Sequence, residues 1–306
     1  MAMSPAHDVG DGVAQAVPSA SFALISGSAG WGITFPDDLR EPGVRTLQRT
    51  MAFDTPWGRS DGWQLIELAA SETADGKPRL ALNVFSHGWP LDRVDHAAHQ
   101  KAFWVLREAG VRKVLSDSTC GSLNRAVQPR DFIIVSDVLD LTQTPYSTLP
   151  GRFRWMCRGA QLICPSLATT LESQARELWP RDARVYGYRN GLVTGFTFGP
   201  RFETPAEARA LSLLGADIAN QSIAPEATNA REIGACFASA TYVVNYVDGV
   251  IAGEWGDLDH IHEELGDPAV RISLRAIARA PLDEACGCAA LRAERPAKYR
   301  EAASLA

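Results

Sequence analysis

Short apolar segments alternate with amphipathic helical ones along most of this chain, and this alternation constrains the fold more than any other feature. Strand-like apolar runs lie at residues 22–25, 80–85, 111–115, 132–135, 191–198, 217–219 and 235–244. Helical patterns lie at about 94–109, 166–178, 204–214, 225–234 and from about 260 past 277. Strands that alternate with helices in this way predict a largely parallel sheet flanked by helices. The expected fold class is therefore α/β.

Composition limits the partners that the chain is expected to have. Hydrophobic residues make up 46% of the 306 residues and charged residues 22%, as in soluble globular proteins. A net charge of -6 argues against nucleic acid or an anionic membrane as the main partner. No run reaches the roughly 18 apolar residues that a membrane span needs. The first twenty residues lack the features of a signal peptide. We expect a flexible extension at 1–20, a folded domain at 21–280 and a C-terminal extension at 281–306.

The six cysteines are scattered through a chain that is long enough to build a core without cross-links. Free thiols in a reducing cytoplasm are the simplest interpretation, and we expect a cytoplasmic protein. The pair Cys286-Gly-Cys288 lacks the usual spacing and a second ligand pair. A zinc site is therefore not expected from the sequence, and no metal is assigned.

Small polar residues recur where the apolar strands end, and they predict a pocket. In open α/β sheets, ligands bind beyond the carboxyl ends of the strands. One such residue alone would be a turn or a cap, but several strands of this chain end in the same way. The residues are Ser28, His87, Ser118, Thr119, Ser222 and Asn245.

The segment from Thr197 to Asp217 adds two candidates. Its helix is explained by Thr204 as N-cap, Pro205 at the first position and Glu207 in a capping box. None of these features requires the aromatic ring of Phe202 or the carboxylate of Glu203 just before the helix.

Several motifs, in order, resemble the trimeric purine nucleoside phosphorylase and methylthioadenosine phosphorylase family. The resemblance runs from about Phe22 to about Leu265. It rests on Gly-Pro-Arg-Phe at 199–202, Gly-Ala-Asp at 215–217, Ala-Pro-Glu-Ala at 224–227, Thr-Pro-Trp-Gly at 55–58, Cys-Gly-Ser-Leu at 120–123, and Pro129, Asp131 and Asp140.

The resemblance implies a mixed, largely parallel and distorted central sheet flanked by helices, and usually a homotrimer. It also implies a pentosyltransferase that cleaves the N-glycosidic bond of a purine nucleoside with phosphate, giving free base and a sugar 1-phosphate. Phosphate is then a co-substrate, and neither a metal nor an organic cofactor takes part. The enzyme must stabilise a departing base and an anionic nucleophile.

The resemblance also assigns roles to single residues. Ser28, His87, Ser118, Thr119 and Ser222 line the phosphate site. Phe202 stacks on the base, Glu203 bonds the edge of the base, and Asn245 bonds N7 of the leaving group. Asn245, Glu203 and His87 are the expected catalytic residues. Gln221, Trp89 and His262 border the ribose.

Two cues favour a 6-oxopurine substrate. Phe-Glu-Thr after Gly-Pro is typical of purine nucleoside phosphorylases, and an amide at 245 is typical of the 6-oxopurine enzymes, whereas the 6-aminopurine enzymes carry Asp. Arg201 resembles the methylthioadenosine branch instead. The base and the 5′ substituent therefore stay open.

Two departures from the family pattern leave the nucleophile open. Ser86 stands where the family has an arginine, and Asp117 lies beside Ser118 and Thr119 where a neutral residue is usual. For a phosphorylase, Arg93, Arg125 and Arg59 are candidates to replace the missing charge. The alternatives are a phosphate-independent nucleosidase with Asp117 as base, and a catalytically silent nucleoside-binding protein.

Overall fold

The structure, a computed structural model, describes residues 16–90, 92–142, 147–148, 155–251, 258–282 and 286–294. Residues 1–15 of the predicted N-terminal extension and 295–306 of the predicted C-terminal extension lie outside these ranges. The predicted domain boundaries therefore stay predictions.

One sheet of eleven strands runs through the molecule, and the α/β fold class is confirmed. Its main path joins the strands in the order β2-β3-β4-β1-β5-β11-β10-β7. In that order their bounds are Val44–Thr55, Gly58–Leu68, Arg79–Val84, Phe22–Ile25, Lys113–Ser122, Ile218–Asn220, Val193–Phe196 and Asp137–Asp140. Strand β12 (Cys236–Tyr246) pairs with β5 and with β6 (Phe132–Ile133), and β6 pairs with β9 (Val185–Tyr186).

The sheet forks at β5. Strand β12 runs parallel to β5 along its whole length, and ten of its eleven residues are buried. On the other side of β5, β1 is parallel to residues 113–116, whereas β11 pairs antiparallel with residues 121–122. Between these partners, residues 117–120 of β5 have no neighbouring strand on that side. This interruption opens a space inside the sheet.

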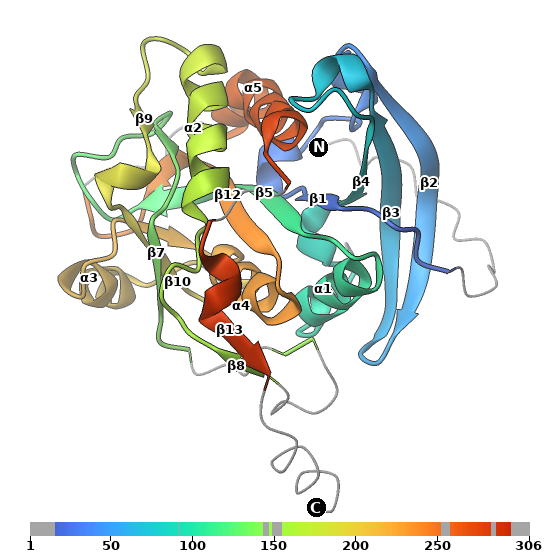
Figure 1. The fold of residues 1–306 in the computed structure, drawn as a ribbon. Coiled ribbons are helices and arrows are strands. Elements are labelled where there is room, and N and C mark those ends of the chain that lie inside the picture. The colour runs from blue at the N-terminus through green and yellow to red at the C-terminus, as the bar shows by residue number, and fades with distance from the viewer. Residues whose placement is uncertain are drawn as a thin grey trace, which may run out of the picture.

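Helices cover both faces of the central strands (Figure 1). Helices α2 (Pro165–Leu178) and α5 (Leu258–Arg279) pack against each other and against β12. Helices α1 (Ala98–Glu108) and α4 (Ile223–Ile233) pack together below these strands in the view of Figure 1. Helix α3 (Pro205–Leu213) lies beside β10. The core is formed where these helices meet the apolar faces of β1, β5 and β12.

The start of α3 follows the sequence prediction. The Thr204 hydroxyl accepts a hydrogen bond from the Glu207 N–H, and the Glu207 carboxylate accepts one from the Thr204 N–H. Helix α1 begins at Ala98, later than expected. Just before it, the Asp95 carboxylate accepts the Ala97 N–H at 3.0 Å, so residues 95–97 form a turn that precedes the helix.

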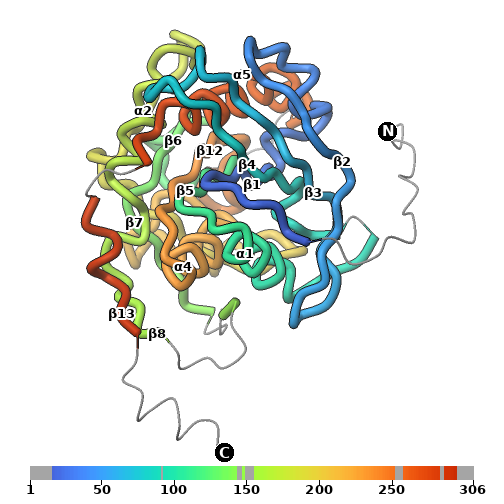
Figure 2. Tube along the Cα trace, turned by 45° about the vertical axis from the view of Figure 1, so that its right-hand side comes forward, coloured from blue at the N-terminus to red at the C-terminus, as the bar shows by residue number. Residues whose placement is uncertain are grey.

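The hairpin of β2 and β3 was not predicted. Figure 2 shows it at the edge of the sheet, outside β4. Its turn is built by the Thr-Pro-Trp-Gly motif: the Thr55 hydroxyl donates to the Gly58 carbonyl at 2.6 Å and accepts the Trp57 N–H at 3.1 Å. This motif therefore closes a hairpin and does not line the pocket described below.

A second sheet is formed by β8 (Trp155–Cys157) and β13 (Arg292–Glu294), which pair antiparallel at the periphery (Figures 1 and 2). Among the helices that the structure describes, none has both the length and the apolar character required to span a bilayer.

Candidate active site

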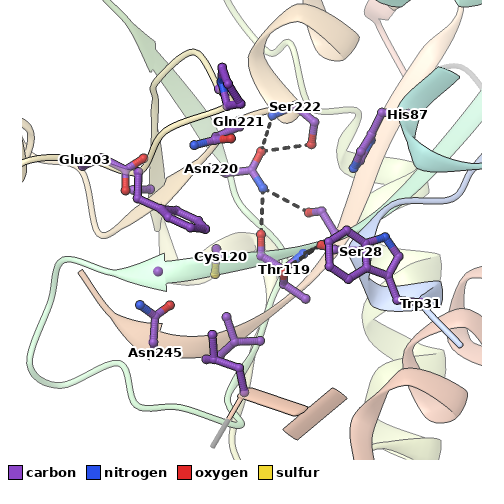
Figure 3. A pocket seen from close by; sticks show the side chains of 18 of the residues that line it. Ser28, Trp31, His87, Thr119, Cys120, Glu203, Asn220, Gln221, Ser222 and Asn245 are labelled. Carbon is purple, nitrogen blue, oxygen red and sulfur yellow. Dashed lines mark hydrogen bonds between the residues drawn. The ribbon is translucent and has the colours of Figure 1, made fainter. Parts of the chain in front are cut away.

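A cavity of about 510 Å³ opens at the fork in the sheet. Its walls come from the strand ends that the sequence analysis singled out, together with the loop before α3 and the start of α5 (Figure 3). Every side chain assigned to the site from the sequence lines this one cavity: Ser28, His87, Trp89, Ser118, Thr119, Phe202, Glu203, Gln221, Ser222, Asn245 and His262. Residues that are distant in sequence are thus brought together, although this placement does not test their roles.

Side chains satisfy the backbone of β5 where no strand pairs with it. The Thr119 N–H donates to the Ser28 hydroxyl at 3.2 Å, and the Ser28 and Thr119 hydroxyls lie 2.7 Å apart. The Asn220 amide donates to the Thr119 carbonyl at 3.0 Å. An unpaired buried peptide group would be costly, so these side-chain contacts replace the hydrogen bonds that a neighbouring strand would make.

Asn220 organises this wall, although sequence analysis did not assign it a role. Its side-chain oxygen accepts the N–H groups of Ser222 and Ile223, both at 2.8 Å, and it thereby caps α4. Its amide nitrogen also lies 3.3 Å from the Ser118 hydroxyl. The available signal was an Asn two residues before a helix-initiating Ser, a position that favours local capping bonds.

His87 is held in an unusual backbone conformation at one end of the cavity. Ser86, His87 and Gly88 all have positive φ values, of 52°, 55° and 76°. Such values are rare for residues with side chains and indicate a conformation imposed by the surroundings. The His87 N–H donates to the Ser26 carbonyl at 3.1 Å. A Cβ atom at Gly27 would lie 2.2 Å from His87 Nε2, so only glycine leaves room for the ring.

Glu226 of α4 is the charged partner of His87. The His87 Nδ1 atom lies 2.6 Å from Glu226 Oε1, and the Glu226 side chain is fully buried. Burial alone lowers the pKa of His87, but the Glu226 carboxylate, with a smaller contribution from Asp117, raises this pKa above its ordinary value. His87 therefore carries a positive charge over a wider pH range than a free imidazole does. Sequence analysis quoted Glu226 within a motif but missed this function.

Asp117 belongs to β5 but is not among the residues lining the cavity. Its carboxylate accepts the Gly27 N–H at 2.9 Å, and its side chain is buried. Burial raises the pKa of Asp117 to about 6, while the Gly27 bond and His87 act in the opposite direction. Asp117 is thus an internal partner of the Gly27 loop, close to His87.

The opposite end of the cavity carries Glu203 and Asn245, which lie on the left in Figure 3, away from His87. Glu203 is buried and accepts a hydrogen bond from the Thr197 hydroxyl. The Asn245 amide nitrogen donates to the Tyr246 carbonyl at 3.0 Å. Phe202 stands at the mouth with 61% of its surface exposed. This end offers a carboxylate, an amide and an aromatic face.

Aromatic side chains border the middle and the mouth of the cavity. Trp31, which sequence analysis missed, stacks on His262 with ring centroids 6.0 Å apart. The Tyr242 hydroxyl lies 3.0 Å from His262 Nδ1, and burial lowers the pKa of His262. The Trp89 indole N–H points to His99 at 3.4 Å, and burial lowers the pKa of His99 to about 3. His99 and His262 are therefore neutral near pH 7.

None of the arginines proposed from the sequence as substitutes lies at the cavity. Arg93 pairs with Asp92, Arg59 with Asp61, and Arg125 donates to the Val250 carbonyl. Arg201, the residue that resembles the methylthioadenosine branch, binds Glu207 on the surface. Among the described residues, no Lys or Arg lines the cavity. Within the described residues, these three arginines therefore do not bring a charge to the cavity, and His87 is the lining residue on this wall whose pKa is raised.

Comparisons with known proteins identify the family of this chain. The family model described as the phosphorylase superfamily matches residues 82–278. A probable 6-oxopurine nucleoside phosphorylase of Thermococcus kodakarensis is 30% identical over 277 residues, which are 87% of this chain and 95% of the relative. A probable S-methyl-5′-thioinosine phosphorylase of Methanopyrus kandleri is 33% identical over 253 residues, which are 81% of this chain and 92% of the relative.

Solved structures share the fold. A methylthioadenosine phosphorylase from an Antarctic soil metagenomic library superposes with a TM-score of 0.67 at 21% identity, covering 85% of this chain and 87% of that one. The adenine complex of the Schistosoma mansoni methylthioadenosine phosphorylase gives a TM-score of 0.61 at 23% identity, covering 85% and 91%. With the cavity at the fork and a family match over most of the sheet, the chain belongs to the phosphorylase superfamily, as its motifs predicted.

Proposed function

We propose that the protein is a purine nucleoside phosphorylase, a pentosyltransferase that cleaves an N-glycosidic bond with phosphate and releases free base and a sugar 1-phosphate. This function was predicted from the motifs, and the names of the relatives support it. The observation that carries the proposal is one cavity with two chemically different ends. Hydroxyl groups and a histidine whose pKa is raised lie at one end, and a carboxylate and an amide at the other.

The His87 end suits phosphate. Ser28, Ser118, Thr119 and Ser222 line the cavity at this end, and the Ser118 hydroxyl also lies 2.9 Å from the Thr241 hydroxyl. The imidazolium of His87 supplies the charge that the family arginine would bring at position 86. A charge-assisted hydrogen bond of this kind contributes about 1.5–3 kcal/mol.

The Glu203 end suits a purine. Phe202 provides a face for the ring, Glu203 accepts from an N–H group at the edge of the base, and Asn245 can both donate and accept. As the glycosidic bond breaks, its electron pair moves onto the purine, and N7 becomes a stronger acceptor. A hydrogen bond from the Asn245 amide to N7 then strengthens in the transition state, which is the requirement for catalysis.

The ribose occupies the space between the two ends. Gln221, whose amide nitrogen is fixed at 2.8 Å from the Arg201 carbonyl, lies on one side, and Trp89 and His262 border the rest. Phosphate held at the His87 end attacks C1′ while the base leaves toward Asn245. His87 stabilises the nucleophile, and Glu203 and Asn245 stabilise the leaving group.

The preferred base is inferred to be a 6-oxopurine. An uncharged amide at position 245 can donate to N7, and the sequence cues from Phe202 and Glu203 point the same way. Relatives named for 6-oxopurine nucleosides and for methylthioinosine both match this chain. The substrate panel described below therefore determines which 5′ substituent the enzyme accepts.

A phosphate-independent nucleosidase is the second candidate, because no arginine lines the cavity in the described residues. Its expected base, Asp117, is bound to the Gly27 N–H and is not among the residues lining the cavity. This placement favours phosphorolysis, since a base must reach the attacking water.

The decisive experiment is a panel of nucleosides, including inosine, guanosine, adenosine, methylthioinosine and methylthioadenosine, incubated with and without phosphate. Base release that requires phosphate is the expected result. Base release at the same rate without phosphate would show that the protein is a nucleosidase. No base release from any nucleoside would support the catalytically silent nucleoside-binding protein.

We also propose that the enzyme is a cytoplasmic homotrimer that needs no organic cofactor. The trimer follows from the family resemblance alone, and the cytoplasmic location is supported by the unbridged state of the six cysteines. Light scattering should give about three times the 33.1 kDa monomer mass. A mass near that of the monomer would contradict the assembly.

A further inference from the structure

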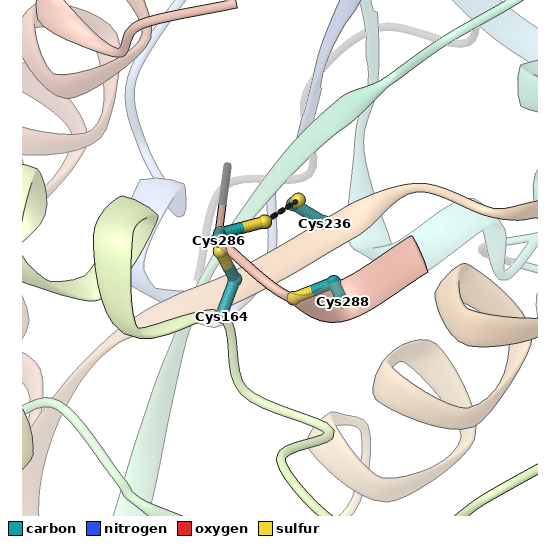
Figure 4. A group of neighbouring side chains, drawn as sticks. All are labelled: Cys164, Cys236, Cys286 and Cys288. Carbon is teal, nitrogen blue, oxygen red and sulfur yellow. Dashed lines mark hydrogen bonds between the residues drawn. The ribbon is translucent and has the colours of Figure 1, made fainter. Parts of the chain in front are cut away.

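Four of the six cysteines converge on one point in the structure (Figure 4). Cys164 immediately precedes α2, Cys236 is the first residue of β12, and Cys286 and Cys288 belong to the segment after α5. Their sulfur atoms all lie within 4.8 Å of one another, and the Cys236 and Cys286 sulfurs are 3.4 Å apart. The sequence-based premise that the Cys286-Gly-Cys288 pair has no second ligand pair is therefore wrong.

We propose that these four cysteines bind one structural Zn²⁺ ion in a tetrahedral site. With Zn–S bonds of about 2.3 Å, tetrahedral geometry places the sulfurs about 3.8 Å apart, which agrees with the observed cluster. Four thiolates in a tetrahedron are typical of zinc or of an iron–sulfur site. Binding releases a proton from each thiol that is still protonated.

The local backbone explains how two neighbouring cysteines can reach the same point. Gly287, between Cys286 and Cys288, has φ = 78°, a left-handed conformation that glycine adopts without strain. This turn lets both thiols join the same cluster as Cys164 and Cys236.

Hydrogen-bond donors surround the cluster, as the outer shell of a thiolate site requires. The buried Lys113 ammonium lies 3.6 Å from the Cys236 sulfur, because Lys113 and Cys236 are register partners on β5 and β12. The Gln161 amide nitrogen lies 3.5 Å from the Cys288 sulfur and 3.0 Å from the Cys286 carbonyl. Arg231 in turn binds the carbonyl of Gln161 at 2.5 Å. Zn²⁺ with four thiolates carries two negative charges, and Lys113 offsets one of them.

The site is structural because it is closed and remote from the reaction. Four protein ligands leave no open position for substrate. Cys236 and Asn245 stand nine positions apart along β12, which is about 30 Å at the usual rise per residue. None of the four cysteines lines the active-site cavity. The ion would instead hold the segment after α5, including β13, against α2 and β12.

The test uses the full chain, purified under argon without chelator or added reductant. Elemental analysis should give about one zinc per chain, and cobalt exchanged into the site should show the charge-transfer and intense visible bands of tetrahedral thiolate coordination. The variants C286S and C288S should lose most of the metal, whereas the control C157S, which alters an exposed cysteine outside the cluster, should retain it.

Thiol chemistry on the wild-type protein distinguishes the alternatives without a variant that must fold. After denaturation with a chelator, all six cysteines should react with an alkylating agent. Protection of four of them until a reductant is added, with a mass deficit of two hydrogens per bridge, would show disulfides and overturn the proposal. Iron in place of zinc, or six free thiols with no metal and no cobalt spectrum, would overturn it as well.

Discussion

Replacing Glu226 by glutamine tests whether His87 supplies the charge for phosphate. Glu226 is fully buried, and its carboxylate lies 2.6 Å from His87 Nδ1. A neutral amide of the same shape removes the charge that raises the pKa of His87. The variant should therefore lose the imidazolium at a lower pH than the wild-type enzyme.

The size of the effect follows from the interaction that is lost. If the imidazolium makes a charge-assisted bond to phosphate of about 1.5–3 kcal/mol, its loss weakens phosphate binding by roughly ten- to a hundredfold. This loss applies at pH values where wild-type His87 is still protonated and the variant is not. Below both pKa values the two enzymes should converge, because His87 is charged in each.

The assay is the pH dependence of kcat/KM for phosphate at saturating nucleoside. In the wild type this parameter should fall as pH rises through the raised pKa of His87, and in E226Q the fall should begin at lower pH. The matched control is E232Q, which makes the same change on the same helix at a carboxylate that binds Ser147 and Thr148. Superimposable profiles for E226Q and wild type would refute the reasoning.

Three further predictions concern the remaining charged and polar groups. In Asp117→Asn, the free energy of unfolding at pH 7.5 should rise by up to about 3 kcal/mol. The pKa of Asp117 is about 6 in the folded protein and ordinarily 3.8, so the ionised carboxylate destabilises the fold above pH 6, and the neutral amide removes this cost. The difference in stability should begin as pH rises through the ordinary pKa of 3.8 and be complete above about 6, so urea unfolding should show little difference near pH 3, where Asp117 is mostly protonated in both the folded and the unfolded state. Equal stability at pH 7.5 would argue against the burial cost, and loss of phosphorolysis would indicate that Asp117 takes part in the reaction. Asn245→Ala should lower kcat more than it raises the nucleoside KM. Asn245→Asp should shift the substrate preference toward 6-aminopurines, because a protonated carboxyl can donate to N7 while a carboxylate can accept from a 6-amino group. Steady-state kinetics with inosine and adenosine measure both effects, and unchanged values would exclude Asn245 from the base site. Ser86→Arg should lower the phosphate KM only slightly, because His87 already supplies a cation. If the wild-type enzyme shows no phosphate dependence and phosphate inhibits the variant, the protein is a hydrolase.

The sequence predicted the alternating strands and helices well where segments are buried. Strand β12 is mostly apolar and almost entirely buried, and α3 has a complete capping box, so both can be predicted without tertiary context. The hairpin of β2 and β3 was missed because it lies at the edge of the sheet and its register shifts between Thr46 and Gln48 and again near Met51. These irregularities break the period-two pattern on which strand prediction depends.

The side chains of the candidate site were predicted because each belongs to a strand end or a local motif. Their supporting partners were not. Glu226 lies on a helix face with Ile223 and Ala227, and a carboxylate in that apolar setting was the available signal. The cysteine cluster was missed because its members belong to three separate segments that only the fold brings together.

Phosphorus NMR of the enzyme with inosine and inorganic phosphate tests the central claim most directly. The account predicts that a sugar 1-phosphate signal grows as inorganic phosphate is consumed, in equal amount to the hypoxanthine measured in the same sample. Hypoxanthine released together with free ribose, while the phosphate signal stays constant, would contradict it.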